Sequence, residues 1–267
     1  QYPGVRRSID SDVDNVAGLM RVAGVLPSGL DIAPMLAEAK RQLHDEADYR
    51  AEGAHLRRFA QLLEGERDFI VPRLHDDLTT QNVLVMDFVE GAPIESLETA
   101  PQQERDRVIE ALVGLMFREL FAFRLMQTDP NFANYRYDPA SGRVILLDFG
   151  ATRALPEALA AGYRGLMQAG LAADRAAMGA RAHALGFLSD EMPAQFQQVV
   201  LDMMETAFEP LRQPGPFDFA QTDVALRLRD AGMELGAARE VWHVPPMDTL
   251  FLQRKFGGIY LLATRLR

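Results

Sequence analysis

The runs QTDPNFAN (127–134) and RVILLDFG (143–150) hold most of the information in this chain. They place Asp129 five residues before Asn134 and nineteen residues before Asp148. Carboxylate and amide oxygens are the hard ligands that Mg²⁺ prefers in proteins. Each of these side chains alone is explained as well by a capped turn or a strand end. The set at this spacing indicates a metal-assisted site.

The segment between the two runs predicts that they meet in space. Residues 135–137 and 144–147 are strand-like, and the sequence DPASG between them (138–142) is rich in turn residues. Together these features predict a β-hairpin. A hairpin brings its outer ends together, so Asn134 and Asp148 should lie close enough to share a metal ion.

This spacing is typical of phosphoryl transfer. An Asp, an Asn five residues later and the Asp of a following D-F-G form the arrangement that a protein-kinase-like C-lobe uses. On this interpretation Asp129 is the catalytic residue that orients the acceptor hydroxyl or an attacking water. Asn134 and Asp148 then hold Mg²⁺, which bridges the phosphates of ATP. The D-F-G run alone would be weak evidence, because three residues recur by chance. The Asp, the Asn five residues later and the D-F-G run together are much more specific.

Seven segments resemble the UbiB-like, aarF-domain atypical kinases, in particular the branch linked to ubiquinone (coenzyme Q) biosynthesis. They are QYPGV (1–5), EADYRAE (46–52), MDFVEG (86–91), FAFRLMQTDPN (121–131), LLDFGATR (146–153), FDF (217–219) and VPP…RKFGG (244–258). Gln127 stands where most kinases have the His of H-R-D, and the D-P-N variant that follows is typical of the ubiquinone branch. The resemblance covers the chain from its first residue to its last.

The resemblance implies an α+β fold of the protein-kinase-like bilobal type. Residues 1–90 would form a partial N-lobe of helix and strands. Residues 91–267 would form a mainly helical C-lobe that carries Asp129 and the D-F-G run. Hydrophobic periodicity and chain breakers predict the further elements, which are helices at 16–25, 31–63, 104–126, 154–188, 191–208 and 222–235, and strands at 69–74 and 82–88.

The resemblance also implies a nucleotide site. Glu52 would be the helix carboxylate that pairs with a lysine, and Met86 would be the gatekeeper between the lobes. The backbones of Asp87 and Val89 would meet the adenine of ATP, a contact that needs main-chain groups and no particular side chain.

Two further acidic residues, Glu46 and Asp48, resemble the E-x-D pair that organises the family's nucleotide site. Residues two apart do not share a helix face, so one of them should point away from the site. A kinase-like site also needs a lysine on a strand to hold the phosphates. Neither Lys40, in a helical stretch, nor Lys255, near the C-terminus, fits that context. The family's lysine would fall just before residue 1, so we expect that the chain lacks the front of its N-lobe.

Composition excludes several other classes. The net charge of −10 argues against a nucleic-acid partner, which needs a basic face on the protein. The five histidines are scattered without a metal-binding spacing, and the lack of cysteine excludes disulfides and thiolate metal sites. No apolar run approaches the roughly 18 residues of a membrane span. The expected location is the cytoplasm or the bacterial inner membrane as a peripheral protein, or the mitochondrial matrix side in a eukaryote.

Only four residues separate Gly150 from LPE (155–157), too few for the activation segment with which a protein kinase binds a peptide. We therefore expect a Mg-ATP-binding ATPase or kinase that supports ubiquinone biosynthesis. The resemblance implies a lipid or quinone precursor, other proteins of that pathway and peripheral membrane contact as partners. Two alternatives stay open. One is a pseudokinase scaffold, which the missing lysine favours. The other is a small-molecule kinase like the aminoglycoside phosphotransferases, against which Gln127 argues.

Overall fold

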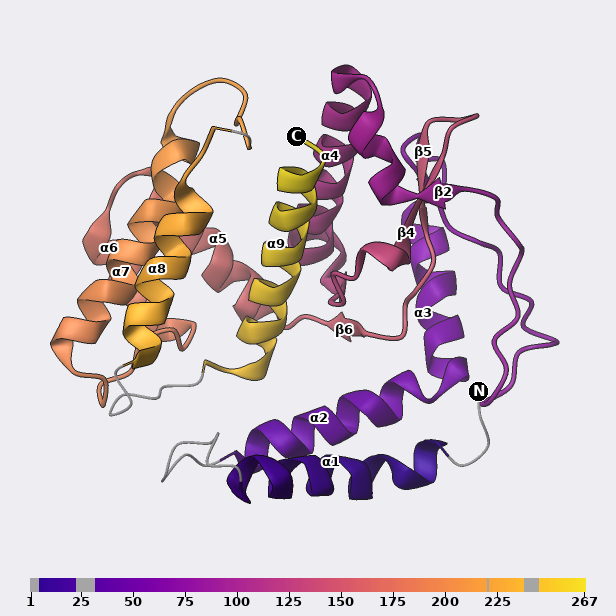
Figure 1. The fold of residues 1–267 in the computed structure, drawn as a ribbon, viewed down its shortest axis with the longest axis horizontal. Coiled ribbons are helices and arrows are strands. Elements are labelled where there is room, and N and C mark those ends of the chain that lie inside the picture. Colours follow the sequence, from indigo (N-terminus) through magenta and orange to yellow (C-terminus); the bar gives the residue numbers. More distant parts are fainter. Residues whose placement is uncertain (1–4, 23–31, 220, 238–244) are drawn as a thin grey trace.

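The computed structural model describes the chain except for residues 1–4, 23–31, 220 and 238–244. Two helices, α1 (Val5–Val22) and α2 (Ala33–Glu46), pack against each other and lie below the rest of the molecule in Figure 1. The helix predicted at 16–25 therefore starts earlier than expected, at Val5. The last three residues of that predicted range lie outside the described part of the chain.

The helix predicted at 31–63 is two helices. α3 (Tyr49–Leu62) follows α2 after a break at Asp48, whose backbone is extended at φ −112° and ψ 92°. The Asp48 side chain accepts a hydrogen bond from the backbone N–H of Arg50, at 3.1 Å. An N-cap of this kind satisfies a free N–H at the start of a helix, and the prediction missed it.

The predicted hairpin is confirmed. β4 (Tyr135–Asp138) and β5 (Arg143–Leu146) pair antiparallel. β1 (Phe69–Ile70) adds to the far side of β5 in parallel, and β2 (Ala92–Pro93) adds antiparallel to β4, giving the order β1-β5-β4-β2. Segments on both sides of residue 90 thus join one sheet around the hairpin, while the division into two lobes stays a prediction.

The two strands predicted before residue 90 are mostly irregular. Within 69–74 only β1 is a regular strand, because Pro72 has no N–H to donate to a ladder. The chain then meets the segment predicted as strand 82–88 through a single bridge between Leu74 and Met86. The two predicted strands therefore do pair, but only at this one antiparallel bridge.

The helix predicted at 104–126 ends early. α4 (Gln102–Arg118) continues as one π-helical turn, η2 (Glu119–Phe123), and stops at Arg124, whose φ of 50° is left-handed. The next residues form β3 (Leu125–Gln127), which pairs with a strand that follows the D-F-G run. The correction matters for the site, because it puts the start of QTDPNFAN on a strand.

That partner strand, β6 (Thr152–Ala154), is antiparallel to β3. The helix predicted at 154–188 then divides into α5 (Glu157–Leu171) and α6 (Arg175–Ala184). The break occurs because Ala173 has a left-handed backbone, at φ 55°, and Asp174 caps α6.

The C-terminal third of the chain is helical and confirms the helices predicted at 191–208 and 222–235. It contains α7 (Ala194–Phe208), α8 (Val224–Ala237) and α9 (Met247–Arg265). Short 3₁₀ turns join the larger elements, namely η1 (Ile94–Thr99), η3 (Phe132–Asn134) and η4 (Glu209–Arg212). In Figure 1 α9 runs through the middle of the molecule, between α5–α8 on one side and α4 on the other.

Buried apolar side chains from α3, α4, the hairpin and α9 form one core, which includes Leu56, Val108, Val144, Leu252 and Leu262. Burial of such side chains is the main favourable term in folding. Within the described ranges, no helix combines the length and the apolar character needed to cross a membrane.

Candidate functional site

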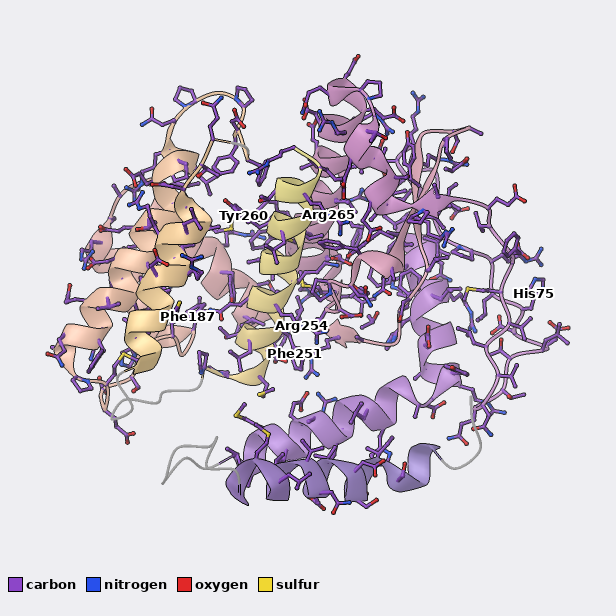
Figure 2. All side chains as sticks on the ribbon, viewed as in Figure 1. His75, Phe187, Phe251, Arg254, Tyr260 and Arg265 are labelled. Carbon is purple, nitrogen blue, oxygen red and sulfur yellow. The ribbon has the colours of Figure 1, made fainter. Side chains whose placement is uncertain are left out.

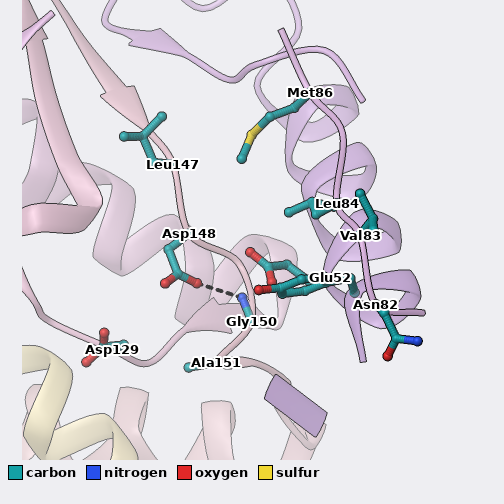
Figure 3. A pocket seen from close by; sticks show the side chains of 11 residues that line it. Glu52, Asn82, Val83, Leu84, Met86, Asp129, Leu147, Asp148, Gly150 and Ala151 are labelled. Atoms are coloured by element: carbon teal, nitrogen blue, oxygen red, sulfur yellow. Dashed lines mark hydrogen bonds between the residues drawn. The ribbon is translucent and has the colours of Figure 1, made fainter. Parts of the chain in front are cut away.

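Four of the predicted residues meet at one pocket. Glu52, Met86, Asp129 and Asp148 line a cavity of about 660 Å³, shown in Figure 3. The other lining residues were not predicted, and they are Tyr49, Asn82, Val83, Leu84, Leu147, Gly150 and Ala151. The lining therefore combines apolar side chains with three carboxylates, a mixture that suits a ligand with an apolar part and a cation-bound part.

Asp129 is held from two directions. Asn134 donates from Nδ2 to Asp129 Oδ2 at 2.9 Å. Arg254, on α9, donates from Nη2 to Asp129 Oδ1 at 2.5 Å. Each oxygen of the carboxylate thus has its own donor, so its direction is fixed while Asp129 still lines the pocket.

The ends of the hairpin meet as the turn sequence predicted. The backbone N–H of Leu147 donates to the carbonyl of Asn134 at 3.1 Å, which places Asn134 next to the residue before Asp148. Asn134 is buried and is not among the lining residues; it reaches the site through its bond to Asp129. Because its side-chain N–H₂ group faces Asp129, its amide oxygen is the atom left for a metal ion.

Glu52 and Asp148 approach the same glycine. Figure 3 shows them on two sides of Gly150, and Asp148 Oδ1 accepts a hydrogen bond from the Gly150 N–H at 2.9 Å. A Cβ added to Gly150 would lie 3.4 Å from Asp148 Oδ1 and 3.5 Å from Glu52 Oε2. Glu52 is buried and comes from α3. Both carboxylates therefore border the space beside Gly150, where a cation would interact favourably with each of them.

Asp48, Asp87 and Val89 are not among the residues that line the pocket. Asp87 contacts His75, with His75 Nε2 and Asp87 Oδ1 2.7 Å apart, and its backbone N–H donates to the carbonyl of Arg73. Val89 does not line the pocket either. Asp48 caps α3, and Glu46 is the last residue of α2, with a side chain outside the described part.

A buried polar cluster lies beside the Asp129 segment, and no sequence motif predicted it. Lys255 donates to the side-chain oxygen of Gln127 at 3.1 Å and to the hydroxyl of Tyr135 at 2.8 Å, and it lies 3.6 Å from a Glu119 oxygen. Burial raises the pKa of Glu119 to about 7, although Lys255 and the Gln127 N–H oppose that shift. Burial also disfavours the Lys255 ammonium, but Glu119 and Tyr135 outweigh it and raise the pKa of Lys255.

The donor set suits Mg²⁺ brought in with a nucleotide. In the described ranges no group of three His, Cys, Asp or Glu side chains is arranged to hold a metal ion. Mg²⁺ in phosphoryl-transfer sites is typically bound by one or two carboxylates, with substrate phosphates and water completing the shell. Asp148 and the amide oxygen of Asn134 are hard oxygen ligands of that kind. These residues therefore fit Mg²⁺, and the phosphates of a nucleotide would complete its coordination shell.

Comparison with known proteins defines the class. The ABC1 atypical kinase-like domain matches residues 1–182, so the chain belongs to this family. The match confirms the resemblance that the motifs indicated.

Individual relatives are similar over the whole chain. The chain is 35% identical over 269 residues to the atypical kinase COQ8, mitochondrial, of Saccharomyces cerevisiae, and 35% identical over 266 residues to the atypical kinase COQ8B, mitochondrial, of Rattus norvegicus. These matches cover 100% of this chain but 53% and 50% of the two relatives. The chain therefore spans about half the length of the curated relatives it matches.

One solved structure has the same fold. It is the complex of Rv3197 with erythromycin from Mycobacterium tuberculosis, with a TM-score of 0.72 and 20% sequence identity, covering 100% of this chain and 66% of that one. The likeness supports the kinase-like fold.

Proposed function

We propose that this chain is the nucleotide-binding core of a Mg-ATP-dependent atypical kinase or ATPase that supports ubiquinone biosynthesis. The observation that carries the proposal is that Asp129, bonded to Asn134, lines the same pocket as Asp148 of D-F-G. Membership of the ABC1 family and similarity to COQ8 proteins support the same activity. The proposal thus covers both the phosphoryl-transfer chemistry and the role in ubiquinone biosynthesis.

Each residue has a role in this proposal. Asp129 orients the attacking oxygen. Its two hydrogen bonds hold the carboxylate in one orientation, so it need not rotate during the reaction. Asp148 and Asn134 bind Mg²⁺, which would neutralise the charge on the β and γ phosphates. Glu52 faces the same space across Gly150 and keeps its negative end near the cation.

The adenine end of ATP is assigned to the wall opposite D-F-G. Met86 lines the pocket there, beside Val83 and Leu84. Asp87 and Val89 follow Met86 along the chain but do not line the pocket themselves. We assign their backbones to the adenine, with the carbonyl of Asp87 as the contact because its N–H is bonded to Arg73. Glu46 and Asp48 keep a supporting role, in which Asp48 caps the helix that carries Glu52.

A small acceptor fits better than a peptide. β6 pairs with β3 directly after D-F-G, and Leu155 donates its N–H to the carbonyl of Arg124 at 2.8 Å. The chain is therefore tied back at the point where a protein kinase would extend its peptide-binding segment. Water or a small alcohol is the acceptor that this geometry supports.

The proposal extends to a membrane surface, with a lipid or quinone precursor and other proteins of the ubiquinone pathway as partners. The mitochondrial names of the relatives support the matrix side for a eukaryotic member, and the cytoplasmic face of the inner membrane is the bacterial equivalent. Val16 and Leu19 on α1 are exposed apolar side chains that suit such contact. Leu19→Gln should lower co-sedimentation with anionic phospholipid vesicles, whereas Leu226→Gln on α8 should not. Equal sedimentation of both variants would reject contact through α1.

Thermal stabilisation by ATP tests the nucleotide site. At about 100 times the dissociation constant, ATP with Mg²⁺ should add roughly 2.7 kcal/mol of stability. Asp148→Asn should abolish the Mg²⁺-dependent part, and Asp190→Asn, which changes an exposed Asp on the surface, should leave it unchanged. A full Mg²⁺-dependent shift in Asp148→Asn would refute the metal role, and release of phosphate measured beside it separates an enzyme from a scaffold.

A further inference from the structure

We propose that α9 completes the catalytic centre, with Arg254 as the residue that positions the Asp129 carboxylate. Lys255 and Gly258 would fix the Asp129 loop, which we define as residues 128–134. The inference rests on the catalytic role proposed above for Asp129. The family model matches residues 1–182 and does not reach α9, although the COQ8 relatives align over the whole chain.

The first observation is the direct contact between Arg254 and Asp129. Figure 2 shows Arg254 on α9, and its guanidinium donates to the one Asp129 oxygen that Asn134 does not bind. The side chain of Arg254 is 47% exposed and that of Asp129 is 24% exposed. Ion pairs as exposed as this contribute little to folding stability. Orientation of a carboxylate that lines the pocket is therefore the better explanation of the contact.

The second observation is that the next residue on α9 contacts both ends of the same loop. The Lys255 ammonium donates to Gln127, just before the Asp129 loop, and to Tyr135, just after it. Lys255 is 3% exposed, and Glu119 supplies the opposite charge. A buried cation is costly in free energy unless it is paired and hydrogen-bonded. Loss of any of these contacts is therefore unfavourable, and Gln127 and Tyr135 stay fixed against Lys255.

The third observation is steric. A Cβ on Gly258 would lie 2.0 Å from the Cβ of Pro130, the residue after Asp129, whereas a Cβ on Gly257 would meet nothing within 4 Å. The backbone of α9 thus rests directly on the Asp129 loop at Gly258. Packing of α9 through Leu252 and Leu262 explains why the helix is buried, but it does not require these contacts to the loop.

Replacement of Arg254 tests the positioning role in the full-length protein. Arg254→Gln should lower kcat for ATP turnover by about 100-fold, the typical effect of a small misplacement of a reacting group, with KM for ATP unchanged. Arg254→Lys should restore part of kcat, because an ammonium still donates one bond to the carboxylate. Arg229→Gln on α8 is the control, since it removes the same charge from an exposed pair with Asp230.

Hydrogen exchange gives a readout that does not depend on turnover. Amide exchange in the Asp129 loop should become faster in Gly258→Ala and Arg254→Gln, and should stay at the wild-type rate in Gly257→Ala and Arg229→Gln. If Gly258→Ala does not fold, the Arg254 variants still decide the question.

The outcomes separate this inference from the proposed function. Faster exchange with unchanged kcat would make α9 a structural support and overturn the positioning role, as would unchanged exchange in Arg254→Gln. A wild-type protein that binds ATP but releases no phosphate would refute the proposed turnover. In that case the exchange rates alone would decide whether α9 orders the loop.

Discussion

Phe149 of D-F-G packs on Phe59 of α3, with their ring centroids 4.9 Å apart and both side chains almost completely buried. Glu52 lies on the same helix and faces the pocket. This aromatic pair therefore joins the helix that carries one carboxylate of the site to the segment that carries another. Movement of either element would change the distance between Glu52 and Asp148.

We expect Phe59→Ala to destabilise the protein by about 3–5 kcal/mol, the usual cost of emptying a buried aromatic site. The free energy of unfolding in urea measures the change. Phe88→Ala is the matched control, because Phe88 is 89% exposed, and it should change stability by less than about 0.5 kcal/mol. Similar losses in the two variants would contradict the structural role of the pair.

A glycine in the segment before α4 gives a second prediction. A Cβ on Gly91 would lie 2.5 Å from Ile145 Cδ1 and 3.0 Å from the carbonyl of Tyr137. Because Ile145 is fully buried and the carbonyl belongs to the sheet, Gly91→Ala should cost about 1–3 kcal/mol of stability, as overpacking of a core does.

The control for this substitution is a glycine inside α4. A Cβ on Gly114 would meet nothing within 4 Å, and alanine is a better helix former than glycine by about 1 kcal/mol. Gly114→Ala should therefore stabilise the protein in the same urea assay. A neutral Gly91→Ala variant would mean that Ile145 moves aside at no cost.

How much of this site follows from the sequence depends on the distance along the chain. The hairpin and the nearness of Asn134 to Asp148 follow from residues within one short segment, whose turn chemistry is local. The contact between Arg254 and Asp129 joins residues 125 apart. RKFGG resembles a family segment, but nothing in its pattern indicates which loop the helix contacts.

The two main secondary-structure errors differ in kind. The break before α3 depends on one side chain, Asp48, which caps a helix that the apolar pattern had continued. The π-helical turn begins at Glu119, whose buried carboxylate meets the ammonium of Lys255 on α9. Asp48 lies only two residues before Arg50, whose N–H it caps, so that break could have been read locally, whereas Lys255 is far from Glu119 along the chain.

The charge state of Glu119 predicts a pH dependence. Its pKa in the folded protein, about 7, is above the ordinary value of 4.5. The folded state therefore binds more protons than the unfolded state between these values, and stability falls as pH rises through that range. Its contribution should be fully present below pH 4.5 and lost as pH passes 7.

Unfolding in urea at pH 5 and pH 8, for the wild type and Glu119→Gln, measures this contribution. The stability of the wild type relative to Glu119→Gln should decrease towards pH 8 by an amount on the order of 3 kcal/mol, since one pKa unit corresponds to about 1.4 kcal/mol. A difference between the two proteins that does not change with pH would show that Glu119 titrates normally.

Asp129→Asn should separate chemistry from binding. The amide keeps one oxygen that accepts from Arg254 and loses the bond from Asn134. The size and shape of the side chain are kept, so the fold and the nucleotide pocket should persist, but the negative charge that orients and deprotonates the acceptor is gone. Such a proton-transfer group typically contributes about 10²–10⁴-fold to a rate, so phosphate release should fall by that factor while Mg²⁺-dependent stabilisation by ATP stays at the wild-type level. Asp148→Asn should instead lose both. If Asp129→Asn lost nucleotide binding and Asp148→Asn kept it, the two aspartates would have to exchange roles.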